Sequence, residues 1–172
     1  GGSVRVESEA GVGTTFELTL PITLAVLSAL VFSVRGHRLV VPLALVQEVV
    51  RIEPRAIQAI DGREWLDLRG TTLPLSRAAD LLCLGGEPAA MPQQHVIVLS
   101  VANRRLGLLV DRIHGQREVV VKPLGESLRC VPGVMGATEV GDQRLAFVLD
   151  AAALVAEVLS PRATQVHAGG AP

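Results

Sequence analysis

Three stretches of this chain repeat one arrangement, and that repeat constrains the fold more than any other feature. Each has an apolar run, then a turn former followed by Arg-Leu, then a second apolar run. The three stretches are 30–46, 96–113 and 134–152. Two apolar strands joined by a short polar turn are typical of a β-hairpin. Three such hairpins in 172 residues favour a mainly β architecture built from similar parts.

The apolar residues are of the kind that pleated sheets favour. They are chiefly Val, Leu, Ile and Ala, and aromatic residues make up only 2% of the chain. The formal net charge is −1. A nearly neutral chain gains little from phosphate backbones, and few aromatic rings are available to stack on bases. We therefore expect no nucleic-acid partner.

Further strands and two short helices are expected around the three hairpins. Alternating or Val-rich runs predict strands at 63–70, 71–76 and 117–124. One helix is expected over 76–82 with Ser76 as its N-cap. A second is expected over 150–159, where Asp150 precedes a run of strong helix formers.

Short strands at close spacing favour small barrels or a sandwich. Residues 1–21 are expected to form a separate hairpin with a Gly-rich connection. The three repeated stretches all lie after Pro21. We expect two barrels of about five strands, at about 22–82 and 94–158, split by a Gly/Pro-rich loop at 83–93. Residues 159–172 are expected to be a disordered tail or a linker.

Few residues have the spacing that is typical of a disulfide, redox or metal-binding site. Cys83 and Cys130 form no CxxC pair, so idle thiols are favoured over a disulfide. The four histidines lack metal-ligand spacing, and no metal site is expected; they are His37, His95, His114 and His167. The longest apolar run, 24–32, is too short to span a bilayer, and no signal peptide is present. A cytoplasmic location follows as the expectation.

Charged residues end several of the apolar strands. The pairs are Asp111–Arg112 and Asp67–Arg69, with Asp150 alone after 147–149. They are either active-site charges or groups that pair with backbone and with each other at barrel rims. The second interpretation is favoured, because a convergent set of His, Asp and Ser or Cys is not evident in the sequence.

The run at 40–50, "VVPLALVQEVV", is apolar on both faces for most of its length. A strand of a small barrel needs only one buried face. The second face of 43–50 is therefore covered either by the neighbouring barrel or by another protein. These two alternatives stay open at the level of sequence.

Several longer segments, taken in order, resemble one protein family. The first is "GGSVRVESEAGVGTTFELTLPITLAVL", and it is followed by "LRGTTLPLSRAADLL", "GLLVDRIHGQREVVVKPLG" and "PGVMGATEVGDQRLAFVLDAAALV". Over residues 1–158 they are similar to the end of the ATP-binding domain and the regulatory domain of CheA-type chemotaxis histidine kinases. That regulatory domain is CheW-like.

The resemblance implies a fold and a role. The fold would be two SH3-like five-stranded β-barrels with few short helices. The domain would catalyse nothing, bind a CheW-type coupling protein, and dock near the cytoplasmic tips of chemoreceptors without membrane insertion. For the coupling-protein surface we single out four apolar residues: Leu43, Val46, Val49 and Ile60. A free-standing CheW-type adaptor is the alternative, and a hydrolase or transferase on a β scaffold is the rival from another class.

The segment "GVGTTF" resembles the last glycine box of a GHKL-type ATPase. Gly11, Gly13 and Thr14 match positions that line the nucleotide pocket in that family. The magnesium-holding and adenine-reading boxes are missing from this sequence. We therefore expect no cofactor in this chain, whereas the parent histidine autokinase would use ATP and Mg²⁺.

Overall fold

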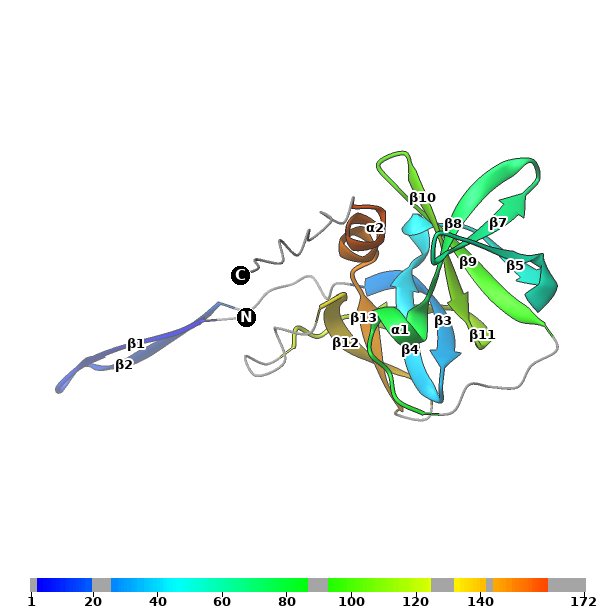
Figure 1. Ribbon diagram of the computed structural model, residues 1–172. Coiled ribbons are helices and arrows are strands. Elements are labelled where there is room, and N and C mark those ends of the chain that lie inside the picture. The colour runs from blue at the N-terminus through cyan, green and yellow to red at the C-terminus, as the bar shows by residue number, and fades with distance from the viewer. Residues whose placement is uncertain (1–2, 20–25, 87–92, 125–131, 142–143, 161–172) are drawn as a thin grey trace, which may run out of the picture.

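The computed structural model describes residues 3–19, 26–86, 93–124, 132–141 and 144–160. These residues form a two-stranded hairpin, a six-stranded sheet and a five-stranded sheet, with two α-helices beside them (Figure 1). The architecture is mainly β with few short helices, as predicted. Its parts can be followed in chain order from the colours of Figure 1.

The five-stranded sheet closes on itself. Its strands in spatial order are β11 (Arg112–Val120), β3 (Val26–Val34), β4 (His37–Pro42), β13 (Arg144–Leu149) and β12 (Val134–Val140). Just after β11, Lys122 exchanges two backbone hydrogen bonds of 2.8 and 2.9 Å with Ala137 of β12. These bonds join the two edges of the sheet, so the strands form a small barrel.

The six-stranded sheet packs beside this barrel. Its strands in spatial order are β5 (Val46–Ile52), β9 (Gln94–Val101), β10 (Arg104–Val110), β8 (Thr71–Arg77), β7 (Arg63–Leu68) and β6 (Ile57–Ile60). Short 3₁₀ turns, η1 (Leu43–Leu45) and η2 (Pro54–Ala56), precede β5 and β6. Within this six-stranded sheet, neighbouring strands run antiparallel except β8 and β10, which run parallel.

The two sheets exchange strands, which corrects the expected division into consecutive barrels at 22–82 and 94–158. β3 and β4 belong with β11–β13, whereas β9 and β10 belong with β5–β8. The chain crosses between sheets at η1 and again at Asp111. Consecutive strands usually pair, which is why sequence order suggested two separate halves. The loop expected at 83–93 and the tail expected at 159–172 both lie partly outside the described residues.

Strand exchange gives the two sheets one shared core. Side chains of both sheets meet there, including Phe32 and Leu39 from one and Ile97 and Leu106 from the other. The opposite faces of β3 and β4 line the barrel interior through Val31 and Val40. These strands are therefore buried on both faces. For residues 39–41, the apolar surplus seen in the sequence is explained by burial against the neighbouring sheet.

The two helices differ in how well the sequence specified them. In α2 (Ala151–Leu159) the Asp150 side chain accepts a hydrogen bond of 2.9 Å from the Ala153 backbone N–H, as predicted for an N-cap. Buried residues of α2 pack into the shared core. The other helix, α1 (Ala78–Leu81), is a single turn with Arg77 as its N-cap residue. The expected cap Ser76 is wrong, because Ser76 still pairs with Leu108 in the sheet.

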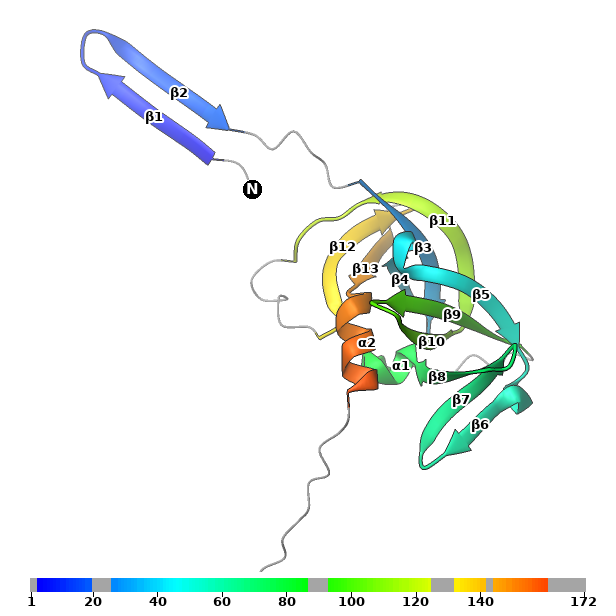
Figure 2. The same cartoon turned by 90° about the horizontal axis from the view of Figure 1, so that it is seen from above.

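The N-terminal hairpin lies apart from both sheets (Figure 2). β1 (Ser3–Glu9) and β2 (Gly13–Thr19) pair in antiparallel register, as predicted. Every residue of 3–18 is exposed, including the apolar side chains of Val4 and Phe16.

Candidate functional site

The four apolar residues expected to bind a partner fall into two groups. Val49 and Ile60 are exposed, at 39% and 56%. They lie on β5 and β6, which are the two edge strands of the six-stranded sheet. Leu43 and Val46 are half-buried and pack against the shared core. The exposed part of the expected surface is therefore Val49 and Ile60, whereas Leu43 and Val46 contribute to the packing of the shared core.

The strand that carries Val49 is suited to receive another protein. Side chains alternate along β5, so that Gln47, Val49 and Arg51 point outward while their neighbours pack inward. Among the described residues, β5 pairs on one side only, with β9. An unpaired strand edge offers backbone N–H and C=O groups as well as side chains to a partner.

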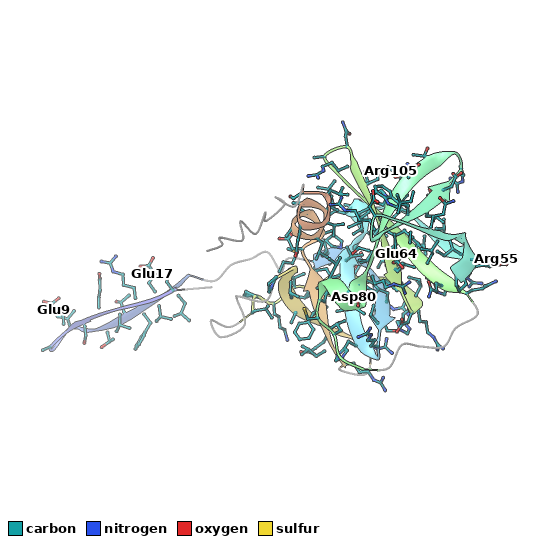
Figure 3. The ribbon with its side chains drawn as sticks, in the orientation of Figure 1. Glu9, Glu17, Arg55, Glu64, Asp80 and Arg105 are labelled. Carbon is teal, nitrogen blue, oxygen red and sulfur yellow. The ribbon has the colours of Figure 1, made fainter. Side chains whose placement is uncertain are left out.

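A groove of about 630 Å³ runs between β7–β8, α1 and the end of α2. Trp65, Pro74 and Leu159 supply apolar surface along it. Two charged residues that line it, Glu64 of β7 and Asp80 of α1, are labelled in Figure 3. Within the groove the Arg77 guanidinium donates to Glu64 Oε1 at 2.7 Å, and both side chains are partly buried.

The carboxylates that end the strands serve the fold, as the favoured interpretation predicted. Asp111 Oδ2 accepts from the Arg35 backbone N–H at 2.6 Å, and Asp67 Oδ1 accepts from that of Gly70 at 2.7 Å. Asp150 caps α2. Arg69 pairs with Glu48 of β5 instead of with a carboxylate on its own hairpin. These acceptors are occupied by backbone or by a guanidinium and do not converge on a cavity.

Two histidines have defined partners. His95 Nδ1 lies 3.2 Å from the Asp111 carbonyl oxygen, and His114 Nε2 lies 3.0 Å from Ser33 Oγ. Burial lowers the pKa of His114, and the nearby cations Arg38 and Arg112 lower it further. The contact between Ser33 and His114 was not predicted, because the residues are 81 positions apart and meet only through the pairing of β3 with β11.

No metal-binding group of three or more His, Cys, Asp or Glu occurs within the described ranges. Cys83 is exposed and unpaired, whereas Cys130 and His167 lie outside those ranges. No helix in the described part of the chain is long and apolar enough to cross a membrane.

The residues that resemble a nucleotide pocket lie at the turn end of the N-terminal hairpin, with Gly11 in the turn and Gly13 and Thr14 at the start of β2. Gly11 and Gly13 adopt positive φ angles of 79° and 151°, and no atom lies within 4 Å of the Cβ position of either. Thr14 Oγ1 hydrogen-bonds Ser8 Oγ at 2.9 Å across the hairpin. In this structure the three residues form the turn end of the hairpin. Their role in nucleotide binding stays a prediction.

Comparison with known protein families gives one match over most of the chain. The model of the CheW-like domain matches residues 28–159. Among solved structures, the scaffolding protein TtCheW from Thermoanaerobacter tengcongensis superposes with a TM-score of 0.64 at 18% sequence identity. That match covers 77% of this chain and 89% of the TtCheW chain.

Curated relatives are longer proteins. The sensor histidine kinase CheAY of Helicobacter pylori is 36% identical over 154 residues, which are 90% of this chain and 19% of that protein. Chemotaxis protein CheA of Salmonella typhimurium is 37% identical over 155 residues, 90% of this chain and 23% of the relative. CheA of Rhizobium meliloti is 36% identical over 176 residues and covers 98% of this chain. The chain thus spans about a fifth of the length of the curated relatives it matches.

Proposed function

This chain belongs to the CheW-like domain family, and from that premise we propose that it is the regulatory and scaffold module of a chemotaxis-type histidine kinase. In this role it binds a CheW-type coupling protein and the cytoplasmic tips of chemoreceptors. It thereby couples the state of the receptors to the activity of the kinase. The module itself catalyses nothing, and it works in the cytoplasm within receptor arrays.

The N-terminal hairpin supports a kinase as the parent protein. The match to the Rhizobium meliloti CheA leaves only about 2% of this chain outside it, so it includes β1 and β2, which the CheW-like model does not. One face of the hairpin carries four exposed apolar residues: Val4, Val6, Phe16 and Leu18. A two-stranded ribbon is marginal alone and needs a covering surface. The preceding ATP-binding domain of a kinase would supply that cover.

On this proposal the hairpin is the C-terminal end of the ATP-binding domain. Gly11, Gly13 and Thr14 would then complete one wall of a nucleotide pocket whose other walls, with ATP and Mg²⁺, belong to the parent kinase. One wall cannot offset the cost of desolvating a polyphosphate. The chain alone is expected to bind no ATP, and isothermal titration at micromolar ATP tests this.

The observation that carries the partner proposal is the exposure of Val49 and Ile60 on the edge strands of the six-stranded sheet. Exposed apolar side chains on strand edges favour a protein partner over a small ligand. We place the coupling-protein surface on these two residues, whereas Leu43 and Val46 pack against the shared core. The near-zero net charge leaves apolar contact as the main source of affinity.

Charge substitutions at the two exposed positions test this surface. Val49→Asp and Ile60→Asp should each weaken binding of a purified CheW-type coupling protein by at least about tenfold, since central apolar anchors contribute about 2 kcal/mol or more. Isothermal titration calorimetry measures the change. Val12→Asp is the matched control, because Val12 is 77% exposed in the hairpin turn and should bind as the wild type does.

Leu43→Asp is not equivalent to these variants, because Leu43 packs against the shared core. It should lower stability as well as binding, and circular dichroism separates the two effects. Normal binding by both Val49→Asp and Ile60→Asp, with the fold intact, would contradict the proposed surface.

A free-standing adaptor is the alternative supported by a specific observation. The fold of this chain covers 89% of the TtCheW chain, so the body without the hairpin resembles an adaptor of that size. The two possibilities differ upstream of Gly1. A reading frame that continues into the missing ATPase boxes identifies a kinase, and one that begins close to Gly1 identifies an adaptor.

A further inference from the structure

Three neighbouring strands of the five-stranded barrel place a hydroxyl between two arginines. Ser33 of β3 lies directly opposite Arg112 of β11 on one side and Arg38 of β4 on the other. Residues paired across a ladder share one face of the sheet, with Cβ atoms about 5 Å apart. The two arginine side chains therefore leave the sheet on either side of the same hydroxyl.

This row lies at one mouth of the barrel. The next residues along the same face, Val31 and Val40, line the barrel interior. A β-bulge interrupts the register between Ile113 and Gly115. The bulge is where His114 turns toward the row, and its Nε2 lies 3.0 Å from Ser33 Oγ. Ser33, Arg38 and His114 are half-buried, whereas Arg112 is exposed.

The cluster carries positive charge without a matching carboxylate. Within the described residues, no Asp or Glu oxygen lies within 4.0 Å of Arg38 or Arg112. Of the thirteen arginines in the described ranges, five have such partners: Arg5, Arg35, Arg55, Arg69 and Arg77. The neighbouring Asp111 is engaged with the Arg35 backbone N–H. Burial is the larger cause of the lowered pKa of His114, and the charges of Arg38 and Arg112 lower it further.

We propose that Ser33, Arg38, Arg112 and His114 form a binding site for a phosphoryl dianion. Arg38 and Arg112 stand on the two strands that flank Ser33, and the Ser33 hydroxyl lies within hydrogen-bond distance of the His114 imidazole. A tetrahedral dianion accepts hydrogen bonds from all of these groups. A planar carboxylate is satisfied by one arginine in a bidentate pair, which would leave the second charge unmatched.

The test is a titration of the purified full chain followed by ¹H–¹⁵N NMR. Inorganic phosphate, O-phosphoserine, acetate and chloride are compared at equal ionic strength and pH. Saturable shifts centred on Ser33 and His114 with phosphate or phosphoserine support the site. The stronger of these two ligands shows whether free phosphate or a phosphate monoester is the better occupant. Acetate shifts of equal size and affinity, or phosphate shifts no larger than those with chloride, would overturn the proposal.

Substitutions locate the site. Arg38→Gln with Arg112→Gln should weaken phosphate binding by at least about tenfold, because charge-assisted hydrogen bonds are lost. Arg51→Gln with Arg63→Gln removes an equal charge from exposed positions of β5 and β7 in the other sheet and should leave the affinity unchanged. Equal weakening by this control pair would mean that net charge alone attracts phosphate, against the proposal. Ser33→Ala, which removes one hydroxyl, provides a second variant if the double substitution unfolds the barrel.

Discussion

Gly107 of β10 shows how tightly single residues are constrained in the six-stranded sheet. A Cβ atom at this position would lie 2.9 Å from Val96 Cγ1 and 3.0 Å from Leu73 Cδ2, closer than side chains pack without displacement. Both neighbours belong to the interior of that sheet, which leaves little freedom to move. Glycine is required here for space, since its φ angle is not in the left-handed region.

Gly107→Ala should lower the free energy of unfolding by about 1–3 kcal/mol through overpacking. Urea denaturation measures the change. Gly85→Ala is the matched control, because no atom lies within 4 Å of its Cβ position and its φ angle is not positive. An unchanged midpoint for Gly107→Ala would mean that the interior of the sheet accommodates the added methyl group without strain.

The pKa of His114 offers a second prediction for a single residue. Burial is the larger cause of its depression, and the charges of Arg38 and Arg112 add to it. Arg38→Gln should therefore raise the pKa of His114 toward its usual value of 6.5 without reaching it. An NMR titration of the imidazole resonances measures this shift. A lower or unchanged pKa in the variant would contradict the proximity of Arg38.

The lowered pKa of His114 also makes the free energy of unfolding depend on pH. The unfolded chain takes up a proton on His114 at a higher pH than the folded chain does, so the unfolded state binds more protons in between. As pH falls below 6.5, His114 should therefore reduce the free energy of unfolding, until the folded pKa is passed. His114→Gln should remove that part of the pH dependence in urea denaturation series. The same slope in wild type and variant would rule His114 out as its source.

At the scale of elements, α2 depends on its N-cap residue, Asp150. The Asp150 carboxylate caps the helix, while its backbone N–H donates to the Gly133 carbonyl at 2.9 Å. Asp150→Ala should cost about 1 kcal/mol of stability by leaving a helical N–H unsatisfied. Asp150→Asn keeps an acceptor oxygen and should remain close to the wild type. Thermal unfolding compares the three proteins, and equal losses in both variants would attribute the effect to charge rather than to capping.

Local patterns predicted most elements but not their neighbours. The three repeated stretches are the hairpins β3–β4, β9–β10 and β12–β13. The apolar run at 40–50 was expected to be one strand, yet Pro42 ends β4 and η1 turns the chain into the other sheet. β6, which lies within 51–62, was not predicted. Alternation identifies which residues face a core, whereas which strands pair is decided by contacts distant in sequence.

Of the four apolar residues chosen from the sequence, only those on edge strands are exposed to solvent. Val49 and Ile60 satisfy that condition, whereas Leu43 and Val46 turn inward against a core that the other sheet helps to build. The cluster around Ser33 could not be anticipated, because its members come from β3, β4 and β11. Ser33 and His114 are 81 positions apart in the sequence and become neighbours only through sheet pairing.

At the scale of the whole molecule, the shared core predicts one unfolding transition. Each sheet contains strands from both halves of the chain, and the core between them takes side chains from both. Neither sheet can therefore unfold without exposing the other. Fluorescence of Trp65, the single tryptophan, reports on the six-stranded sheet, while the Ser33 amide resonance reports on the barrel. The two probes should give coincident urea midpoints, and separate midpoints would show two independent folding units.

During translation, β3 and β4 leave the ribosome long before the strands that complete their barrel, since β11 begins only at Arg112. Until then the nascent chain holds a ribbon whose two outer edges are unpaired and whose Val31 and Val40 side chains have no barrel to enclose them. Such ribbons join readily to copies of themselves on neighbouring polysomes. A chaperone that keeps the first ribbon separate should therefore matter more for this protein than for one built from consecutive barrels. The reason is the order in which the strands are synthesised.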